Sequence, residues 1–199
     1  MKKIGIIGSG IVGQTLANGF VKHGYDVVIG TNTPAKRDEL AAKTKARVGS
    51  FDDVAKFGEI VVLATKGTAA EAALKAAGLA NLDGKTVIDT TNPIADAAPV
   101  NGVLQYFTAQ NESLMERLQA LAPNARFVKA FSCIGNAFMV NPDFNGERPT
   151  MFICGNDADA KDNVKAVLDR FGFDVSDMSG SMARAPSSRS ASCGAFPGS

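Results

Sequence analysis

A turn with regularly spaced glycines constrains the fold of this chain more than any other feature. Gly8, Gly10 and Gly13 match the pattern G-x-G-x-x-G. The apolar run 4–7 precedes them, and residues 11–22 have apolar side chains at helical spacing. In a strand-turn-helix unit, the first glycine allows a tight turn, the second lets the backbone approach a pyrophosphate, and the third lets the helix pack on the strand. The pattern therefore predicts a dinucleotide site with phosphates at the helix N-terminus. The residues predicted to contact the cofactor here are Gly8, Ser9, Gly10, Ile11, Val12 and Gly13.

The end of the second predicted strand favours NADP over NAD. An acidic side chain there normally accepts hydrogen bonds from the ribose 2′-hydroxyl and would repel a 2′-phosphate. The apolar run 27–29 is instead followed by Thr31 and Asn32, without an acid. Lys36 and Arg37 follow one turn into the next predicted helix. Thr31, Asn32 and Lys36 are therefore predicted contacts of the 2′-phosphate. The alternative is that Lys36 and Arg37 only belong to a solvated helix surface.

Strand-like and helix-like segments alternate along the chain. This alternation predicts an α/β fold of the Rossmann type, a doubly wound, mostly parallel sheet with helices on both faces. The 199 residues have room for one such domain, which we place at residues 1–184. The predicted strands are 4–7, 27–29, a short one near Val48, 59–64, 85–89, 126–130, 150–154 and 173–175, and the predicted helices are 11–22, 34–45, 67–77, 112–121 and 157–170.

Polar residues follow two of the later predicted strands, at the edge of the sheet where such folds bind ligands. Thr65 and Lys66 follow the strand 59–64, and Asn92 follows the strand 85–89. These three residues are predicted to contact the cofactor. For Asn92 a structural interpretation is equally favoured, because an Asn-Pro pair marks a fixed turn.

The chain has no obvious group for acid-base catalysis, which a dehydrogenase of hydroxy acids usually needs. His23 comes at the end of the first predicted helix, where a cation is favourable, and we interpret it as structural. Lys129 is a candidate acid in the strand 126–130, but we expect its head to reach solvent. We find no catalytic triad, metal-ligand cluster or carboxylate pair. Such a chain suits hydride transfer to a second cofactor ring, which the protein needs only to orient.

Charge, cysteine usage and hydropathy limit the expected partners. The 21 basic and 20 acidic residues give a net charge of +1, so nucleic acid is not an expected partner. Cys133, Cys154 and Cys193 are widely spaced without a C-x-x-C pair, which argues against a zinc site or a disulfide framework. No apolar stretch approaches the ~20 residues that span a bilayer. We therefore expect a cytoplasmic protein with small-molecule partners and no membrane partner.

Six motifs in a fixed order carry a resemblance to a known family. They are I-G-I-I-G-S-G-I-V-G at 4–13, V-V-I-G-T-N-T-P-A-K at 27–36, V-V-L-A-T-K-G at 61–67, V-I-D-T-T-N-P at 87–93, V-K-A-F-S-C-I-G at 128–135 and F-I-C-G-N-D at 152–157. Together they resemble the coenzyme F420-dependent NADP oxidoreductases and their bacterial dinucleotide-binding relatives. The resemblance implies hydride exchange between NADP(H) and a deazaflavin ring, without a dedicated acid or base of the protein.

The resemblance also implies roles for individual residues. The contacts with NADP that it implies are the segment 9–12, Thr31, Asn32, Lys36 and Asn136, and the residues that it places near the ring pair are Ser132 and Ile134. Family members commonly have arginine at the position of Asn32, and asparagine or histidine at the position of Ser132. A flavin is the alternative acceptor, as in the related cytosolic domains of membrane metalloreductases. A homodimer is the expected assembly.

The composition changes after Arg184. Nine of the fifteen residues in 185–199 are Ser, Gly or Pro and none is Leu, Ile or Val, which predicts an irregular tail. One choice of codons for 186–199, read from its third base, encodes I-E-P-L-C-I-L-W-C-I-P-G-F. That string resembles the apolar helix with which family members continue after A-R-A. We therefore consider a reading-frame shift at Pro186 that leaves the C-terminal part of the domain short or altered, and the nucleotides of the gene are its test.

The leading prediction is an NADP(H)-dependent oxidoreductase that passes a hydride to F420 or a flavin. A noncatalytic NADP(H)-binding or redox-sensing protein is the alternative, motivated by the missing acid-base group and the unusual tail. An imine or proline-type reductase shares the opening glycine turn, but the second, helical domain of that class is missing from this sequence.

Overall fold

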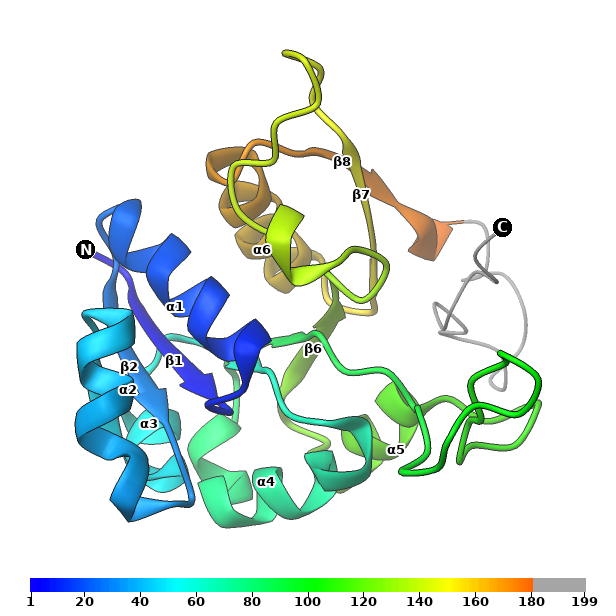
Figure 1. Ribbon diagram of the computed structural model, residues 1–199, viewed down its shortest axis with the longest axis horizontal. Coiled ribbons are helices and arrows are strands. Elements are labelled where there is room, and N and C mark those ends of the chain that lie inside the picture. The colour runs from blue at the N-terminus through cyan, green and yellow to red at the C-terminus, as the bar shows by residue number, and fades with distance from the viewer. Residues whose placement is uncertain (181–199) are drawn as a thin grey trace.

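Eight strands form one sheet in the computed structural model, which describes residues 1–180. They are β1 (Lys3–Ile7), β2 (Asp26–Gly30), β3 (Arg47–Gly49), β4 (Ile60–Leu63), β5 (Thr86–Asp89), β6 (Arg126–Lys129), β7 (Thr150–Gly155) and β8 (Asp174–Asp177). Their order across the sheet is β3-β2-β1-β4-β5-β6-β7-β8. Figure 1 shows β1 and β2 on one side of the molecule and β6, β7 and β8 farther across it. Neighbouring strands are parallel except for β6 and β7, which are antiparallel.

Helices cover both faces of this sheet, as the doubly wound fold requires. They are α1 (Ile11–Lys22), α2 (Arg37–Thr44), α3 (Phe51–Phe57), α4 (Ala70–Ala77), α5 (Leu114–Leu121) and α6 (Ala158–Arg170). Buried side chains of α1, α2 and α6 form one apolar core with the sheet, and those of α3, α4 and α5 form the other. The predicted fold class, a mostly parallel Rossmann-type sheet, is confirmed.

The sheet changes its winding direction at β1. This strand lies between β2 and β4, and the chain leaves β1 for α1 on one face but leaves β4 for α4 on the other. The two connections therefore diverge at the carboxyl ends of β1 and β4, the point at which open α/β sheets bind ligands.

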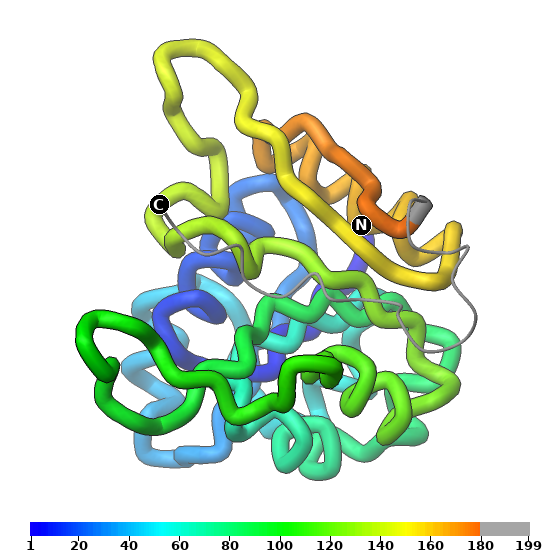
Figure 2. Tube along the Cα trace, turned by 90° about the vertical axis from the view of Figure 1, so that its right-hand side faces the viewer, coloured from blue at the N-terminus to red at the C-terminus, as the bar shows by residue number. Residues whose placement is uncertain are grey.

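Two long connections flank this point. Residues 93–107 form a hairpin-like excursion after β5, with bridges between Ile94 and Tyr106 and between Val100 and Val103. The second connection runs from β6 to β7 and contains the 3-10 turn Asn136–Phe138. Figure 2 shows both as long loops on the left of the molecule, in green and yellow-green.

Several details differ from the sequence-based expectation. No helix was predicted at α3, and the reversed direction of β7 was not foreseen. The predicted helices 34–45 and 67–77 each begin with a 3-10 turn, Pro34–Lys36 and Gly67–Ala69. The predicted tail at 185–199, with its frame-shift hypothesis, lies outside the described residues.

The short helix α3 depends on a capping box at its N-terminus. The Ser50 hydroxyl accepts a hydrogen bond from the Asp53 backbone N–H at 3.1 Å, and the Asp53 carboxylate accepts one from the Ser50 N–H at 2.9 Å. Because they act on the ionised form, the side-chain and backbone hydrogen bonds from Ser50 lower the pKa of Asp53 below its ordinary value.

We expect Ser50→Ala to lower the free energy of unfolding by about 1 kcal/mol at neutral pH. The loss should shrink as the pH falls through the folded-state pKa of Asp53, since a lowered carboxyl pKa stabilises only above the unfolded pKa. Urea denaturation at neutral and acidic pH measures both effects. Ser113→Ala is the control, because Ser113 starts α5 without a side-chain capping hydrogen bond. This substitution should lower the free energy of unfolding by only about a few tenths of a kcal/mol. Equal losses for the two variants would contradict the capping argument.

A candidate dinucleotide-binding cleft

The glycine turn after β1 packs too closely for side chains at two of its three glycines. Gly8 has a φ of +123°, and a Cβ on it would lie 2.4 Å from the Ala64 carbonyl oxygen. A Cβ on Gly13 would lie 2.0 Å from the Gly8 carbonyl oxygen, so α1 packs directly on the turn. A Cβ on Gly10 would meet nothing within 4 Å. The space in front of Gly10 is therefore open, and a side chain there would fill it.

The first turn of α1 presents its backbone N–H groups to this open space. Gly10 is the N-cap residue and has no side chain to accept from them, and the first turn contains no acidic residue. The Gln14 side chain donates to the Ser9 carbonyl oxygen at 2.8 Å and so ties the helix to the turn. Uncapped amides at a helix N-terminus are a binding site for an anion such as phosphate.

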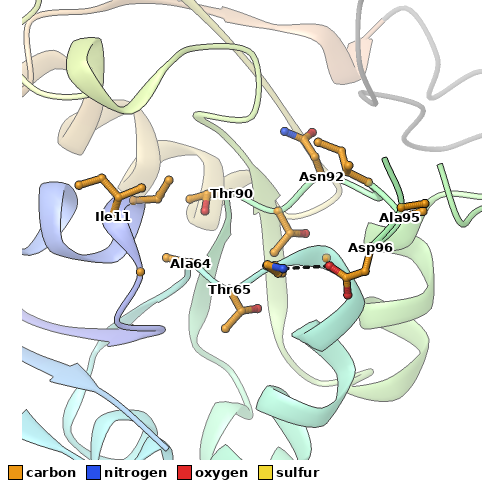
Figure 3. A pocket seen from close by; sticks show the side chains of 14 residues that line it. Ile11, Ala64, Thr65, Thr90, Asn92, Ala95 and Asp96 are labelled. Carbon is orange, nitrogen blue, oxygen red and sulfur yellow. Dashed lines mark hydrogen bonds and ion pairs between the residues drawn. The ribbon is translucent and has the colours of Figure 1, made fainter. Parts of the chain in front are cut away.

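A cleft of about 800 Å³ opens beside Gly10, between the loops that follow β1, β4 and β5. Figure 3 shows Ile11 on one side of it, Asn92 on the other, and Thr65 and Thr90 between them. Its volume is in the range of small-molecule and cofactor sites. The turn residues Gly10, Ile11 and Val12 and the predicted contacts Thr65, Lys66 and Asn92 line this one cleft.

The strand-end loops hold one another in place around the cleft. A Cβ on Gly67 would lie 2.1 Å from the Asn92 carbonyl oxygen, so the loops after β4 and β5 are in direct backbone contact. The Asn92 side chain donates to the Ser132 carbonyl oxygen at 3.0 Å and so links the loop after β5 to the loop after β6. Asn92 thus has a structural contact on one side and faces the cleft on the other.

Two side-chain oxygens in the cleft wall are buried without a partner among the described residues. They are Thr65 Oγ1 and Asn92 Oδ1. A buried polar atom without a hydrogen bond costs free energy, on the order of 1–3 kcal/mol. Both residues line the cleft.

One ion pair lies at the rim of the cleft. Lys66 Nζ is 2.9 Å from Asp96 Oδ1, drawn as the dashed line in Figure 3, and Thr68 donates to the other oxygen at 2.8 Å. The hydrogen bonds from Lys66 and Thr68 lower the pKa of the Asp96 carboxyl below its ordinary value. Asp96 is therefore ionised at neutral pH and is not a proton donor.

A second, smaller hollow of about 110 Å³ lies beside the turn, between α1 and α2. The predicted residues Ser9 and Lys36 line it, together with four residues that were not predicted, Gln14, Glu39, Leu40 and Lys43. The helical spacing of Lys36 and Lys43, two turns apart, was the available signal. Lys43 pairs with Glu39 at 2.6 Å, and this hydrogen bond and charge, with the charge of Lys36, lower the pKa of Glu39.

Thr31 directly follows β2 and is in contact with the turn residue Ser9. Its side chain is buried, accepts from the Ser9 hydroxyl at 3.2 Å and accepts from the Thr33 backbone N–H at 3.1 Å. Thr31 therefore fixes the end of β2 against the glycine turn. Asn32 is exposed directly after it.

Three further predicted residues follow β6 and do not line either hollow. Ser132 is in contact with Asn92 through its carbonyl oxygen. Ile134 is partly buried against the apolar core that includes α1 and α6. Asn136 begins the 3-10 turn Asn136–Phe138.

The structure corrects the expectation for Lys129 and agrees with that for His23. The Lys129 head does not reach solvent: its side chain is only 6% exposed and pairs with Asp89 at 3.0 Å. The pairing was missed because Asp89 is 40 residues away in sequence. His23 ends α1, shares a hydrogen bond with Asn141 at 2.9 Å and lies against the Phe171 ring, in a structural role.

Similarity to known proteins extends over nearly all of the chain. Residues 3–93 match the family described as NADP oxidoreductase, coenzyme F420-dependent. A solved structure from Arthrobacter sp. FB24, assigned as an F420-dependent NADP reductase, is 33% identical, with a TM-score of 0.81 over 90% of this chain and 84% of that chain. This chain belongs to the coenzyme F420-dependent NADP oxidoreductase family. The resemblance drawn from the six motifs is confirmed, and NADP(H) is the cofactor of this family.

Two more distant similarities add context to this family membership. Metalloreductase STEAP3 of Rattus norvegicus is 31% identical over 184 residues, which are 92% of this chain. The chain spans 35% of the length of that curated relative. A reductive aminase from Aspergillus terreus, solved with NADPH, is 20% identical, with a TM-score of 0.64 over 89% of this chain and 55% of that chain. At that identity the likeness shows the fold alone.

The cleft fits the NADP(H) of the family on two observations. The space at Gly10 and the uncapped amides of α1 suit a pyrophosphate. The hydroxyl and amide side chains of Thr65 and Asn92, which line the cleft, suit polar groups farther along a bound dinucleotide.

We expect Gly10→Ala to separate folding from cofactor binding. The new Cβ meets nothing in the protein, so the midpoint of thermal unfolding should stay within a few degrees of the wild type. It would project into the cleft and weaken NADPH binding about tenfold or more. NADPH fluorescence titration and thermal unfolding measure the two effects. Gly13→Ala is the contrast, because its Cβ would overlap the Gly8 carbonyl and should lower stability as well. Wild-type affinity in Gly10→Ala would rule out this placement of the pyrophosphate.

Proposed function

We propose that the protein transfers a hydride between NADPH and a deazaflavin or flavin ring bound beside it. The observation that carries the proposal is the cleft next to Gly10, with uncapped helix amides at one end and two unpartnered buried oxygens in its wall. Family membership supports F420 as the acceptor, and the similarity to a metalloreductase supports a flavin as the alternative.

The cofactor would extend from the small hollow into the cleft. The turn 8–13 would hold the pyrophosphate, and Thr31, Asn32 and Lys36 would hold the 2′-phosphate. On the nicotinamide side the proposed contacts are Thr65, Lys66 and Asn92. Asn136 is a further proposed contact with NADP, and Ser132 and Ile134 are proposed to lie near the ring pair.

NADPH supplies the hydride when bound, and the acceptor ring takes it together with one proton. The residues of this chain need only bind, orient and exclude water. The titratable side chains that line the cleft are Lys66 and Asp96, which pair with each other at its rim. Because Asp96 stays ionised, the proton for the reduced ring would come from water at the open mouth of the cleft. Orientation alone can supply several kcal/mol of the barrier, roughly 7–11 at best.

The first experiment mixes the protein anaerobically with NADPH and F420 and follows both absorbance bands. Parallel reactions replace F420 by FMN, and NADPH by NADH. We expect NADPH-dependent reduction of F420, or of FMN if a flavin is the acceptor. Tight NADPH binding without reduction of either ring would favour the noncatalytic binding or sensing alternative, and absence of NADPH binding would refute the proposal.

Localisation and assembly stay predictions. Within residues 1–180, no helix has the length and apolar character needed to cross a bilayer. A cytoplasmic homodimer is proposed from the sequence and the family resemblance. Size-exclusion chromatography with light scattering tests the dimer.

We expect Lys36→Ala to raise the KM for NADPH about tenfold and to leave the KM for NADH unchanged. Lys36 lines the small hollow and has no ion-pair partner among the described residues, so it is available to a 2′-phosphate. A hydrogen bond to a charged group is worth about 1.5–3 kcal/mol, which covers a tenfold change. Steady-state kinetics with both nucleotides measures it. Arg37→Ala is the control, since Arg37 is exposed and does not line the hollow. Equal effects on NADPH and NADH, or equal effects of both substitutions, would contradict the assignment.

A further inference from the structure

A buried ion pair lies beneath the cleft and has no part in the chemistry described so far. Asp89 and Lys129 are the last residues of β5 and β6 and are direct neighbours in the register of these strands. Their side chains therefore project from the same face of the sheet. Lys129 Nζ lies 3.0 Å from Asp89 Oδ2, and the two side chains are 6% and 0% exposed.

Both members of the pair also bind the backbone or side chain of Thr91. The Asp89 Oδ1 atom accepts from the Thr91 N–H at 2.9 Å and from the Thr91 hydroxyl at 2.7 Å. Lys129 donates to the Thr91 carbonyl oxygen. All three polar groups of Thr91 are thus engaged by the ion pair, and Thr91 is only 2% exposed.

Thr91 is the centre of the cleft wall that follows β5. Thr90, Thr91 and Asn92 all line the cleft. The Thr90 hydroxyl is held by the Leu63 carbonyl oxygen at 3.0 Å. Asn92 reaches Ser132 on one side, and its carbonyl oxygen packs on Gly67 on the other. A shift of Thr91 would move Asn92 out of both contacts.

A buried ion pair is weak evidence for a gain in stability. Removing two charges from water costs several kcal/mol for each, and well-packed apolar residues of similar volume are often as stable or more stable. What an apolar pair would lack is the set of three directed bonds to Thr91. The pair therefore fixes the position of Thr91 in a way that an apolar pair would not.

We propose that Asp89 and Lys129 are positioning residues for the cofactor. They hold the segment 90–92 in the conformation in which Thr90, Thr91 and Asn92 line the cleft. The inference rests on the proposed function, because it assigns these two residues a role in binding NADPH. Neither residue is proposed to contact the reacting atoms.

Two double variants test the proposal without leaving a buried charge unpaired. Asp89→Leu with Lys129→Met removes the charges and every bond to Thr91. Asp89→Asn with Lys129→Met removes the charges but keeps an acceptor for the Thr91 N–H and hydroxyl. We expect NADPH dissociation constants about tenfold above wild type for the first variant and about threefold for the second. NADPH fluorescence titration measures them, together with KM, kcat and the thermal unfolding midpoint.

The control is the double variant Lys161→Met with Asp177→Asn. This pair, at 2.8 Å, joins α6 to β8 and does not line the cleft. We expect its NADPH affinity to equal that of the wild type. A purely structural role of Asp89 and Lys129 would lower the unfolding midpoint and the active fraction but leave the dissociation constant of the folded protein unchanged.

The outcomes separate this inference from the proposed function. If wild-type protein fails to bind NADPH, the proposed function is wrong. If the wild type binds NADPH and both folded double variants bind it as tightly as the wild type does, the positioning role is wrong. If Asp89→Leu with Lys129→Met does not fold, the NADPH affinity of Asp89→Asn with Lys129→Met decides: a weakened affinity supports the positioning role, and wild-type affinity overturns it. A loss of affinity in the control as large as in the test variants would also overturn the proposal.

Discussion

The structure depends on close contacts between backbone segments at the carboxyl edge of the sheet. Gly13 packs on the Gly8 carbonyl, Gly8 on the Ala64 carbonyl and Gly67 on the Asn92 carbonyl, each too closely for a Cβ. These contacts join the loops after β1, β4 and β5 into one wall. Because they involve backbone, the wall is stiff, and the N-terminus of α1 has a fixed direction toward the cleft. A site of this kind orients a bound molecule before any side chain acts on it.

Polar chemistry is distributed unevenly around this wall. Charged groups lie at the rim, as in the pair of Lys66 and Asp96, or beneath the wall, as in Asp89 and Lys129. The wall itself carries hydroxyl, amide and backbone groups, and two of its side-chain oxygens have no hydrogen-bond partner within residues 1–180. This arrangement suits polar rings and phosphates, and it agrees with the proposed reaction, in which the cofactors carry the chemistry.

Local sequence signals predicted the parts of the fold that short-range physics determines. The glycine turn and the alternation of strands and helices were sufficient for the fold class and for the side of the cleft that contains Gly10. The helix α3 was missed although Ser50 and Asp53 have capping-box spacing, because seven residues are too few for a periodic pattern. The burial of Lys129 could not be predicted, because it depends on a partner in another strand and on the register between the two.

The antiparallel direction of β7 has an electrostatic consequence for the whole carboxyl edge. Helices that follow parallel strands, such as α1 and α4, direct the positive ends of their macrodipoles toward that edge. Since β7 is reversed, α6 begins at the opposite edge and turns its negative end toward the cleft side. The field of the helices therefore favours an anion near β1 and β4 and disfavours one near β7. An electrically asymmetric edge of this kind would orient a molecule with phosphates at one end and an uncharged ring at the other.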